Sequence, residues 1–289
     1  MPAPLVISRA NPRVKQLRAA FAGHARLSGG LIAIEGEHLL REALRSGLPC
    51  KTIFVTERTS LPGWAPRSVE LIELSGEVFR SAVDTQSPQG IAALLLPPTW
   101  TIADACPAHP AGRAPLLLIA AGLQDPGNLG TLIRSSEAFG ATAVLTTPGT
   151  VSQWNQKALR ASAGSVFRVP VVAIAPADVP RLKSQGIHLF AAVAVAGAGS
   201  DSDPDSDSDT PLRPGSLSVA AADLAQACAL MIGNEGAGLS DEWLRLSDTR
   251  ITIPTPGPVE SLNAAIAGSL LLYEASRQRA LNPQPATNN

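Results

Sequence analysis

Three short segments of this 289-residue chain bring polar side chains and glycines together, although only 16% of the residues are charged. In the first segment, Asn128, Gly130 and Arg134 follow an apolar run that ends at Ala121. An arginine presents N–H donors in a planar fork, which suits a phosphate or a developing oxyanion. An asparagine orients polar groups by hydrogen bonds, and a glycine permits close backbone approach. The segment has the residue types of a catalytic turn; the alternative is an ordinary strand-to-helix turn capped by Asn128.

The second and third segments have the same mixed character. The second, at 233–238, reads GNEGAG and directly follows an apolar run. Its glycine spacing matches neither a dinucleotide-binding turn nor a phosphate loop, so it suits a neutral or cationic ligand. The third runs from Ile253 through three prolines to the Ser-Leu-Asn at 261–263. Ser261 is a candidate N-cap, and the free N–H groups of a first helical turn can bind a polar ligand. A rigid loop with a cap is the structural alternative.

The elements that must position these segments follow from alternating apolar runs and amphipathic stretches. Early in the chain we expect a basic amphipathic helix from Pro12, strands at 31–34, 52–55 and 91–96, and helices at 37–46 and 77–82. Later we expect strands at 116–121, 143–146, 169–174, 189–195, 229–232 and 251–253, and helices at 128–139, 240–246 and 261–279. This alternation favours an α/β fold with a parallel sheet covered on both faces. Ligands bind such sheets at the carboxyl ends of strands, where the first two segments begin.

Composition changes divide the chain into two predicted domains. Residues 1–97 form a small α/β domain, residues 98–115 a proline-rich linker, and residues 116–289 a second α/β domain. Within the second domain, residues 197–214 include the acidic stretch SDSDPDSDSDT, which has no apolar side chain and is predicted to be disordered. Its alternating aspartates raise the possibility of calcium binding, but the glycine turn and closing glutamate of an EF-hand loop are missing.

Charge and cysteine usage exclude several classes of protein. With 23 Lys and Arg against 24 Asp and Glu, the chain is no histone-like polycation. No apolar run is long enough for a membrane helix, and the N-terminus lacks the pattern of a secretory signal. Cys50, Cys106 and Cys228 are far apart and form no CxxC pair, so neither a metal site nor a disulfide framework is expected. We predict a soluble protein of a reducing cytoplasm.

The first 30 residues are nevertheless locally basic. They contain five cations and no acid. A basic helix face is typical either of a solvated surface or of a site for a polyanion such as RNA. The candidate RNA-binding residues are Arg9, Arg13, Lys15, Arg18 and Arg26.

The order and spacing of the three segments resemble the SpoU (TrmH-type) family of RNA ribose 2′-O-methyltransferases within the SPOUT class. The family's Asn-x-Gly-x-x-x-Arg, Gly-Asn-Glu-Gly-x-Gly and Ile-Pro…Ser-Leu-Asn motifs match the three segments in turn, and the resemblance covers Leu116 to about Arg279. Shorter matches at 8–15, 34–36 and 87–90 resemble the RNA-binding domain that precedes the catalytic domain in rRNA-directed members. These matches favour the polyanion interpretation of the basic arm.

The resemblance implies S-adenosylmethionine as the cofactor, a trefoil knot in the C-terminal domain, and a homodimer with the active site near the subunit interface. The residues it assigns to the cofactor are Ile232, Gly233, Gly238, Ile253, Pro254 and Leu262. The residues it assigns to catalysis are Arg134, Asn128, Glu235, Ser261 and Asn263. Arg134 would act either as the base or, since an arginine side chain presents only donors, as a holder of phosphate and oxyanion. Glu235 is the competing base.

Two positions depart from the family pattern, and rival functions stay open. Ala265 and Thr255 replace the usual polar residue and the usual methionine, which concerns the fine geometry of the cofactor pocket. The expected activity is methylation of a ribose in large-subunit rRNA. A tRNA methyltransferase and a catalytically silent RNA-binding protein are the alternatives. The absence of the GxGxxG dinucleotide-binding motif disfavours a nicotinamide-dependent enzyme.

Overall fold

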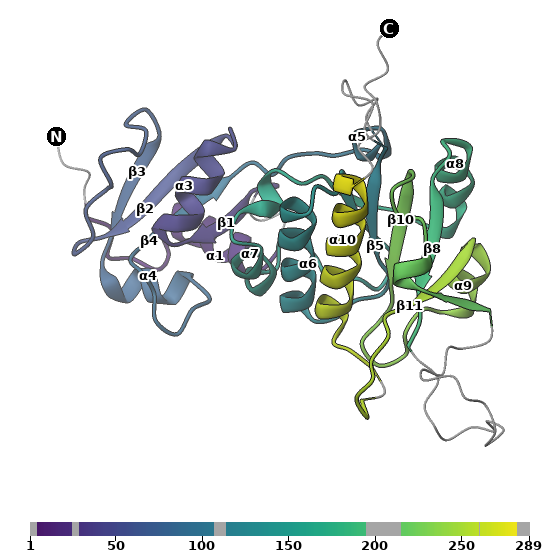
Figure 1. Cartoon of the computed structure of the whole chain (residues 1–289). Coiled ribbons are helices and arrows are strands. Elements are labelled where there is room, and N and C mark those ends of the chain that lie inside the picture. Colours follow the sequence, from purple (N-terminus) through teal and green to yellow (C-terminus); the bar gives the residue numbers. More distant parts are fainter. Residues whose placement is uncertain (1–4, 25–28, 107–113, 195–214, 260, 282–289) are drawn as a thin grey trace, which may run out of the picture. The chain divides into compact units, whose positions relative to one another are not determined.

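The computed structural model describes residues 5–24, 29–106, 114–194, 215–259 and 261–281 (Figure 1). The chain divides into two compact units. The first contains Met1–Thr99 and Ser152–Arg168, and the second contains Trp100–Val151 and Val169–Asn289. The predictions for the acidic stretch at 197–214, for part of the 98–115 linker and for Arg26 lie outside the described residues.

The first unit is built on a four-stranded sheet with the order β1-β4-β2-β3. Strand β4 is antiparallel to β1 and β2, whereas β3 is parallel to β2. The strands are β1 (Ile32–Glu35), β2 (Cys50–Thr56), β3 (Glu70–Leu74) and β4 (Ile91–Leu95). The helices are α1 (Pro12–Phe21), α3 (Glu37–Arg45) and α4 (Gly76–Ala82). Leu17 of α1 and Phe54 of β2 are fully buried in one apolar cluster, so α1 is an integral part of this unit.

A segment from the middle of the chain also belongs to the first unit. Helix α7 (Gln156–Ser162) and the 3₁₀ turn η1 (Ser165–Phe167) follow β6 of the second unit in sequence. The buried Gln156 side chain donates from Nε2 to the Ala33 carbonyl of β1 at 2.9 Å. Arg168 donates to Glu42 of α3 at 2.8 Å. The sequence predicts one domain over residues 116–289, whereas the contacts group 152–168 with the N-terminal unit.

The second unit is built on a seven-stranded sheet with the order β7-β6-β5-β10-β8-β11-β9, in which all pairs are parallel. The strands are β5 (Leu116–Ala120), β6 (Ala143–Thr146), β7 (Val171–Ala173), β8 (His188–Ala192), β9 (Ser216–Ser218), β10 (Cys228–Ile232) and β11 (Thr249–Thr252). Every residue of the neighbouring strands β5 and β10 is buried, as expected where helices cover both faces of a parallel sheet. The α/β fold class predicted from the sequence is confirmed.

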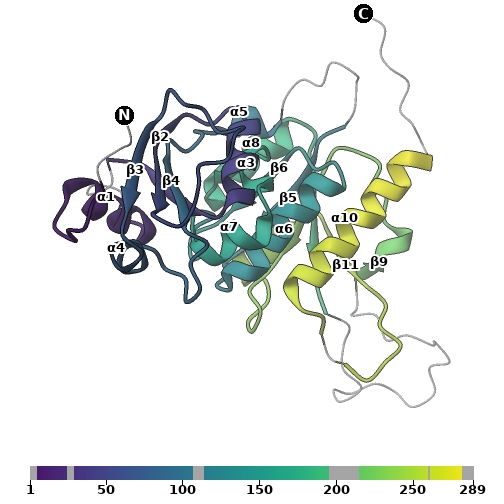
Figure 2. The same cartoon turned by 90° about the vertical axis from the view of Figure 1, so that its left-hand side faces the viewer.

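Helices cover both faces of this sheet. They are α5 (Ile102–Ala105), α6 (Pro126–Ala138), α8 (Val179–Ser184), α9 (Asp241–Leu246) and α10 (Ala264–Leu281). Helices α6 and α10 lie side by side in both views (Figures 1 and 2), and the Ser135 and Ser269 hydroxyls meet at 2.7 Å. A Cβ on Gly268 would lie 2.4 Å from Leu132, which shows how closely α10 packs on α6. Helices α8 and α9 cover the opposite face.

The cysteines are free thiols, and none is placed for a disulfide. Burial raises the pKa of Cys228 to about 11, and also that of the half-buried Cys50 to about 11. Within the described ranges, no group of three His, Cys, Asp or Glu side chains could hold a metal ion. The helices found there include none that is long and apolar enough to cross a membrane.

Candidate active site

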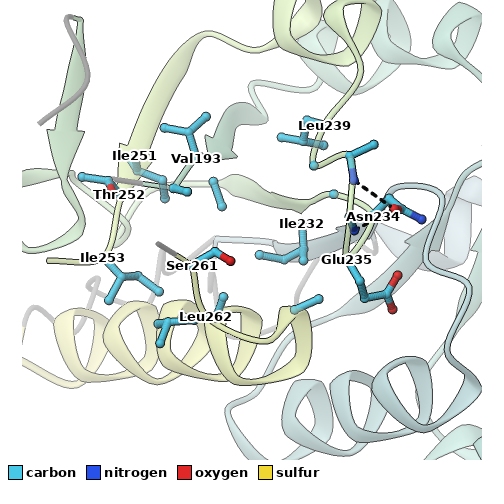
Figure 3. Close-up of a pocket in the computed structure, with 18 of the residues that line it drawn as sticks. Val193, Ile232, Asn234, Glu235, Leu239, Ile251, Thr252, Ile253, Ser261 and Leu262 are labelled. Atoms are coloured by element: carbon cyan, nitrogen blue, oxygen red, sulfur yellow. Dashed lines mark hydrogen bonds between the residues drawn. The ribbon is translucent and has the colours of Figure 1, made fainter. Parts of the chain in front are cut away.

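A cavity of about 320 Å³ lies at the carboxyl ends of β8, β10 and β11 (Figure 3). The turn that follows β10 forms one wall, and the connection from β11 to α10 forms another. The predicted site residues that line the cavity are Ile232, Gly233, Glu235, Gly238, Ile253, Ser261 and Leu262. The second and third sequence segments therefore meet at the sheet edge where the strand order predicts a ligand site.

The turn at 233–238 is held by its own backbone. Asn234 and Gly238 exchange two backbone hydrogen bonds, of 3.0 and 2.9 Å. The Asn234 side chain accepts from the backbone N–H groups of Gly236 and Ala237 and donates to the Gly122 carbonyl at 2.9 Å. A Cβ on Gly233 would lie 2.2 Å from the Gly238 carbonyl carbon, so no larger residue fits there. This close approach is the physical reason for the first glycine of the motif.

The third segment differs from the prediction at the start of α10. The helix begins at Ala264, and Asn263 caps it by accepting from the N–H groups of Ala265 at 2.9 Å and Ile266 at 3.2 Å. Ser261 as the N-cap is therefore wrong; it is exposed and lines the cavity. Asparagine caps a helix about as well as serine, so residue type alone did not decide between them.

The start of α6, in the first segment, also differs from the prediction. Helix α6 begins at Pro126, and its N-cap is Asp125, which accepts from the Asn128 N–H at 2.9 Å. Asn128 as the N-cap is therefore wrong. Proline at the first position and aspartate before it are a favourable start for a helix. The side chain of Asn128 is free for other partners.

A chain of hydrogen bonds links the three segments. Asn263 donates from Nδ2 to Asn128 Oδ1 at 3.1 Å, and Asn128 donates from its own Nδ2 to Glu235 Oε1 at 2.9 Å. These contacts connect residues 107 and 135 positions apart in the sequence. We call this arrangement the Asn-Asn-Glu chain. It holds both amides and the carboxylate next to one another, close to the carboxyl end of β10.

Glu235 is held as a carboxylate. Burial acts to raise the pKa of Glu235. Hydrogen bonds act in the opposite direction and together have the larger effect; they come from the Asn128 side chain, from its own backbone, and from the N–H groups of Gln124 and Asp125. The net effect is a pKa below the ordinary value of 4.5. The two backbone donors are 3.4 Å from its oxygens. A carboxylate whose pKa is lowered by donors is a weak base, so the geometry favours an orienting role.

Arg134 and Pro254 are not brought into the cavity wall. Arg134 is exposed on α6, about 9 Å further along the helix than Asn128. Its side chain makes no hydrogen bond or ion pair to any residue that the structure describes. Of the two departures from the family pattern, Thr255 lines the cavity, whereas Ala265 is buried outside its wall.

The basic N-terminal arm is largely committed to contacts inside the first unit. Arg9 pairs with Glu77 at 2.6 Å and Arg13 with Glu70 at 3.0 Å. Arg18 donates to the backbone and side chain of Ser81. Lys15 is exposed. The acids that neutralise Arg9 and Arg13 lie 57 or more positions away, so the sequence pattern did not reveal these pairs.

Several wall residues were not predicted. Val193, Leu239, Leu244 and Ile251 supply apolar walls, and Thr252 places a buried hydroxyl there. Leu239 directly follows the second motif and Ile251 lies two positions before the third, whereas Val193 and Leu244 have no such sequence signal. Asn234 belongs to the second motif, but its role as the brace of the turn is visible only in the fold.

With this geometry in place, comparison with known proteins defines the class of this chain. The sequence model of the SpoU rRNA Methylase family matches residues 115–273, and that of the MRM3-like substrate binding domain matches residues 11–93. The chain belongs to the SpoU rRNA methylase family.

Individual relatives span nearly the whole chain. It is 34% identical over 267 residues to the 23S rRNA (guanosine(2553)-2′-O)-methyltransferase RlmP of Bacillus subtilis, covering 92% of this chain and 96% of RlmP. It is 32% identical to the mitochondrial rRNA methyltransferase 3 of Xenopus laevis, covering 86% of this chain and 70% of the relative. Among solved structures, the SpoU methyltransferase AviRb from Streptomyces viridochromogenes in complex with AdoMet superposes with a TM-score of 0.77 at 26% identity, covering 93% of this chain and 98% of AviRb.

Proposed function

We propose that this protein transfers a methyl group from S-adenosylmethionine to a ribose 2′-oxygen in large-subunit rRNA. The observation that carries the proposal is the Asn-Asn-Glu chain beside an apolar cavity at the carboxyl ends of the parallel strands. RlmP and a Streptomyces viridochromogenes relative, 30% identical over 291 residues, are named as methyltransferases of a guanosine and a uridine ribose in 23S rRNA. Since those bases differ, the proposal concerns the ribose and not the base.

The cavity fits this cofactor. Its volume of about 320 Å³ is in the range of small-molecule sites. Among the described wall residues there is no Lys, Arg or His, and Glu235 is the one charged group, which suits a cationic sulfonium and not a diphosphate. The Thr252 hydroxyl is buried without a partner in the described part of the chain, as expected where a polar ligand is missing. The turn at 233–238, Ile253 and Leu262 would hold the cofactor, which supplies an electrophilic methyl group.

The chain's own residues would position the ribose and manage its charge. The Asn128 and Asn263 amides would hold the nucleotide in line with the methyl group, and Glu235 would fix Asn128. Ser261 would offer a hydroxyl at the cavity wall. Arg134, which has only donors, would hold a phosphate and stabilise the oxyanion that develops as the 2′-oxygen passes its proton to solvent water.

A homodimer belongs to the same proposal. Helix α10 exposes Ile266, Leu270 and Tyr273 at 53%, 43% and 52%. These positions are spaced i, i+4 and i+7, so they form one apolar stripe. An apolar stripe of this kind is typical of a protein interface. Because α10 packs against α6, a second chain seated on the stripe would lie beside the helix that carries Arg134.

Titration calorimetry with S-adenosylmethionine, followed by transfer of a labelled methyl group to unmodified rRNA, tests the proposal. We expect one cofactor per chain and label in large-subunit rRNA. Label in tRNA instead would support the tRNA alternative, and an absence of cofactor binding would support a silent RNA-binding protein. A cytoplasmic location, where ribosomes are assembled in bacteria, is part of the proposal.

A further inference from the structure

A surface hollow on the first unit brings an aromatic ring and two guanidinium groups together. It measures about 480 Å³ and is lined by Arg41, Leu44 and Arg45 of α3 and by Trp64 from the connection between β2 and β3. Trp64 is 38% exposed, and the Arg41 guanidinium carbon lies 4.9 Å from the centre of its ring. We call these four residues the Trp64 cluster. The candidate active site uses none of them.

One carboxylate contacts two members of the cluster. Glu37 Oε1 accepts from Arg41 Nη2 at 2.8 Å and from Trp64 Nε1 at 3.3 Å. The indole and the guanidinium are therefore held together before any ligand arrives. A preorganised aromatic and guanidinium surface binds a flat ring with little ordering cost.

Arg45 is the member of the cluster whose positive charge is available to a ligand. Its side chain is 69% exposed and lies 3.5 Å from Glu42. Glu42 also receives Arg168 at the shorter distance of 2.8 Å, so its negative charge is largely used. At 3.5 Å the Arg45–Glu42 pair is a weak one, so Arg45 can exchange Glu42 for a phosphate. The arginines of the N-terminal arm differ, because Arg9 and Arg13 have their own carboxylates at 2.6 and 3.0 Å.

We propose that the Trp64 cluster binds an unpaired nucleotide of the RNA substrate, with the base stacked on Trp64 and Arg41 and a phosphate on Arg45. This inference rests on the proposed function. Proteins recognise RNA sequences largely through splayed-out bases that stack on aromatic rings and guanidinium planes, which is the combination found in this hollow. The cluster also lies within residues 11–93, which match a substrate-binding domain family.

Binding of the full-length protein to an unmodified large-subunit rRNA transcript tests the inference. Trp64→Ala should weaken binding roughly 5- to 100-fold through loss of one stacked base, whereas Trp64→Phe should retain most of the affinity. Arg45→Ala should reduce the slope of log affinity against log salt by about one. Ile7→Ala, which removes a 74% exposed side chain elsewhere on the same unit, is the matched control. The KM for RNA should rise in Trp64→Ala while cofactor binding stays unchanged.

The outcomes separate this inference from the proposed function. If the wild-type protein methylates rRNA but Trp64→Ala binds the transcript as tightly as the wild type, or no more weakly than Ile7→Ala, the nucleotide site is wrong and the enzyme activity stands. If the wild-type protein neither binds nor methylates rRNA, the proposed function fails and takes this inference with it. Photocrosslinking of 4-thiouridine-containing transcript should attach RNA to the peptide that contains Trp64; crosslinks confined to other peptides would overturn the assignment.

Discussion

At the residue scale, Glu235 shows how a motif residue gains its role from its partners. Its type and position within the second motif made it a candidate base, but the donors from Asn128, Gln124 and Asp125 lower its pKa and use its oxygens. The contact to Asn128 joins positions 107 apart. A local pattern identifies such a carboxylate but not the donors that change its chemistry.

Substitutions at Glu235 separate an orienting role from a basic one. Glu235→Gln keeps an acceptor for Asn128 and should retain much of the methyl-transfer rate, whereas Glu235→Ala should lose about 10- to 100-fold, the scale of one hydrogen bond to a charged group. Single-turnover rates measure both. Equal loss in the two variants, with disappearance of the acidic limb of the pH profile, would favour the base.

The lowered pKa of Glu235 also predicts a pH effect on stability. A carboxyl group with a lower pKa in the folded state stabilises the protein fully above its ordinary value of 4.5 and loses this effect as the pH falls through the folded value. The stability difference between wild type and Glu235→Gln, measured by chemical denaturation, should therefore be constant at neutral pH and shrink below pH 4.5. A difference that grows on acidification would contradict the direction of the pKa shift.

Arg134 is best tested by lysine. Arg134→Ala removes both possible functions, but Arg134→Lys keeps the positive charge while losing the planar fork and gaining a group that can deprotonate. We expect low activity at every pH, because the role proposed for Arg134, to hold a phosphate and the oxyanion, needs the planar fork. Single-turnover rates from pH 6 to pH 10 provide the readout. Substantial activity that rises with a titrating profile would identify a base at this position.

At the element scale, the turn at 233–238 depends on a backbone contact that only glycine permits. Gly233→Ala places a Cβ 2.2 Å from the Gly238 carbonyl carbon and should lower stability by about 1–3 kcal/mol, as overpacking does. Gly236→Ala is a control for stability, because its nearest neighbour would be 3.7 Å away. Thermal unfolding compares the two. Equal melting temperatures would show that the turn can relax around a side chain.

Element types were more predictable than their partners. Fully apolar runs became the central strands β5 and β10, and the helices at α6 and α9 were found within two residues of their bounds. Strand β3 was missed because two of its five residues are glutamates, and β9 because it has only three residues; both lie at sheet edges, where burial imposes little pattern. The assignment of 152–168 to the first unit was also missed, because it depends on long-range contacts such as Gln156 to Ala33.

At the scale of the whole molecule, each of the two units is formed by two separate segments of the chain. Removing residues 1–97 alone would strip the partners from the buried residues of α7 and η1, among them Leu159 and Phe167. The trefoil knot stays an implication of family membership. The cavity proposed to hold the cofactor, by contrast, is lined entirely by residues of the second unit.

The proposed homodimer depends on the stripe on α10. Leu270→Arg places a charge in the centre of the stripe and should convert a dimer into a monomer, since a desolvated unpaired charge opposes association. Light scattering after size-exclusion chromatography measures the mass. Leu281→Arg, at a 66% exposed position at the end of the helix, is the control. A wild-type monomer at micromolar concentration would exclude the dimer.

Mapping of ribose methylation tests the central claim most directly. A 2′-O-methyl group protects the adjacent phosphodiester from alkaline cleavage, so rRNA and tRNA from cells with and without this protein can be compared nucleotide by nucleotide. The account predicts a protected position in large-subunit rRNA that is lost without the protein, restored by the wild type and not restored by Arg134→Ala. Identical rRNA maps in the two cell populations, or a change confined to tRNA, would contradict it.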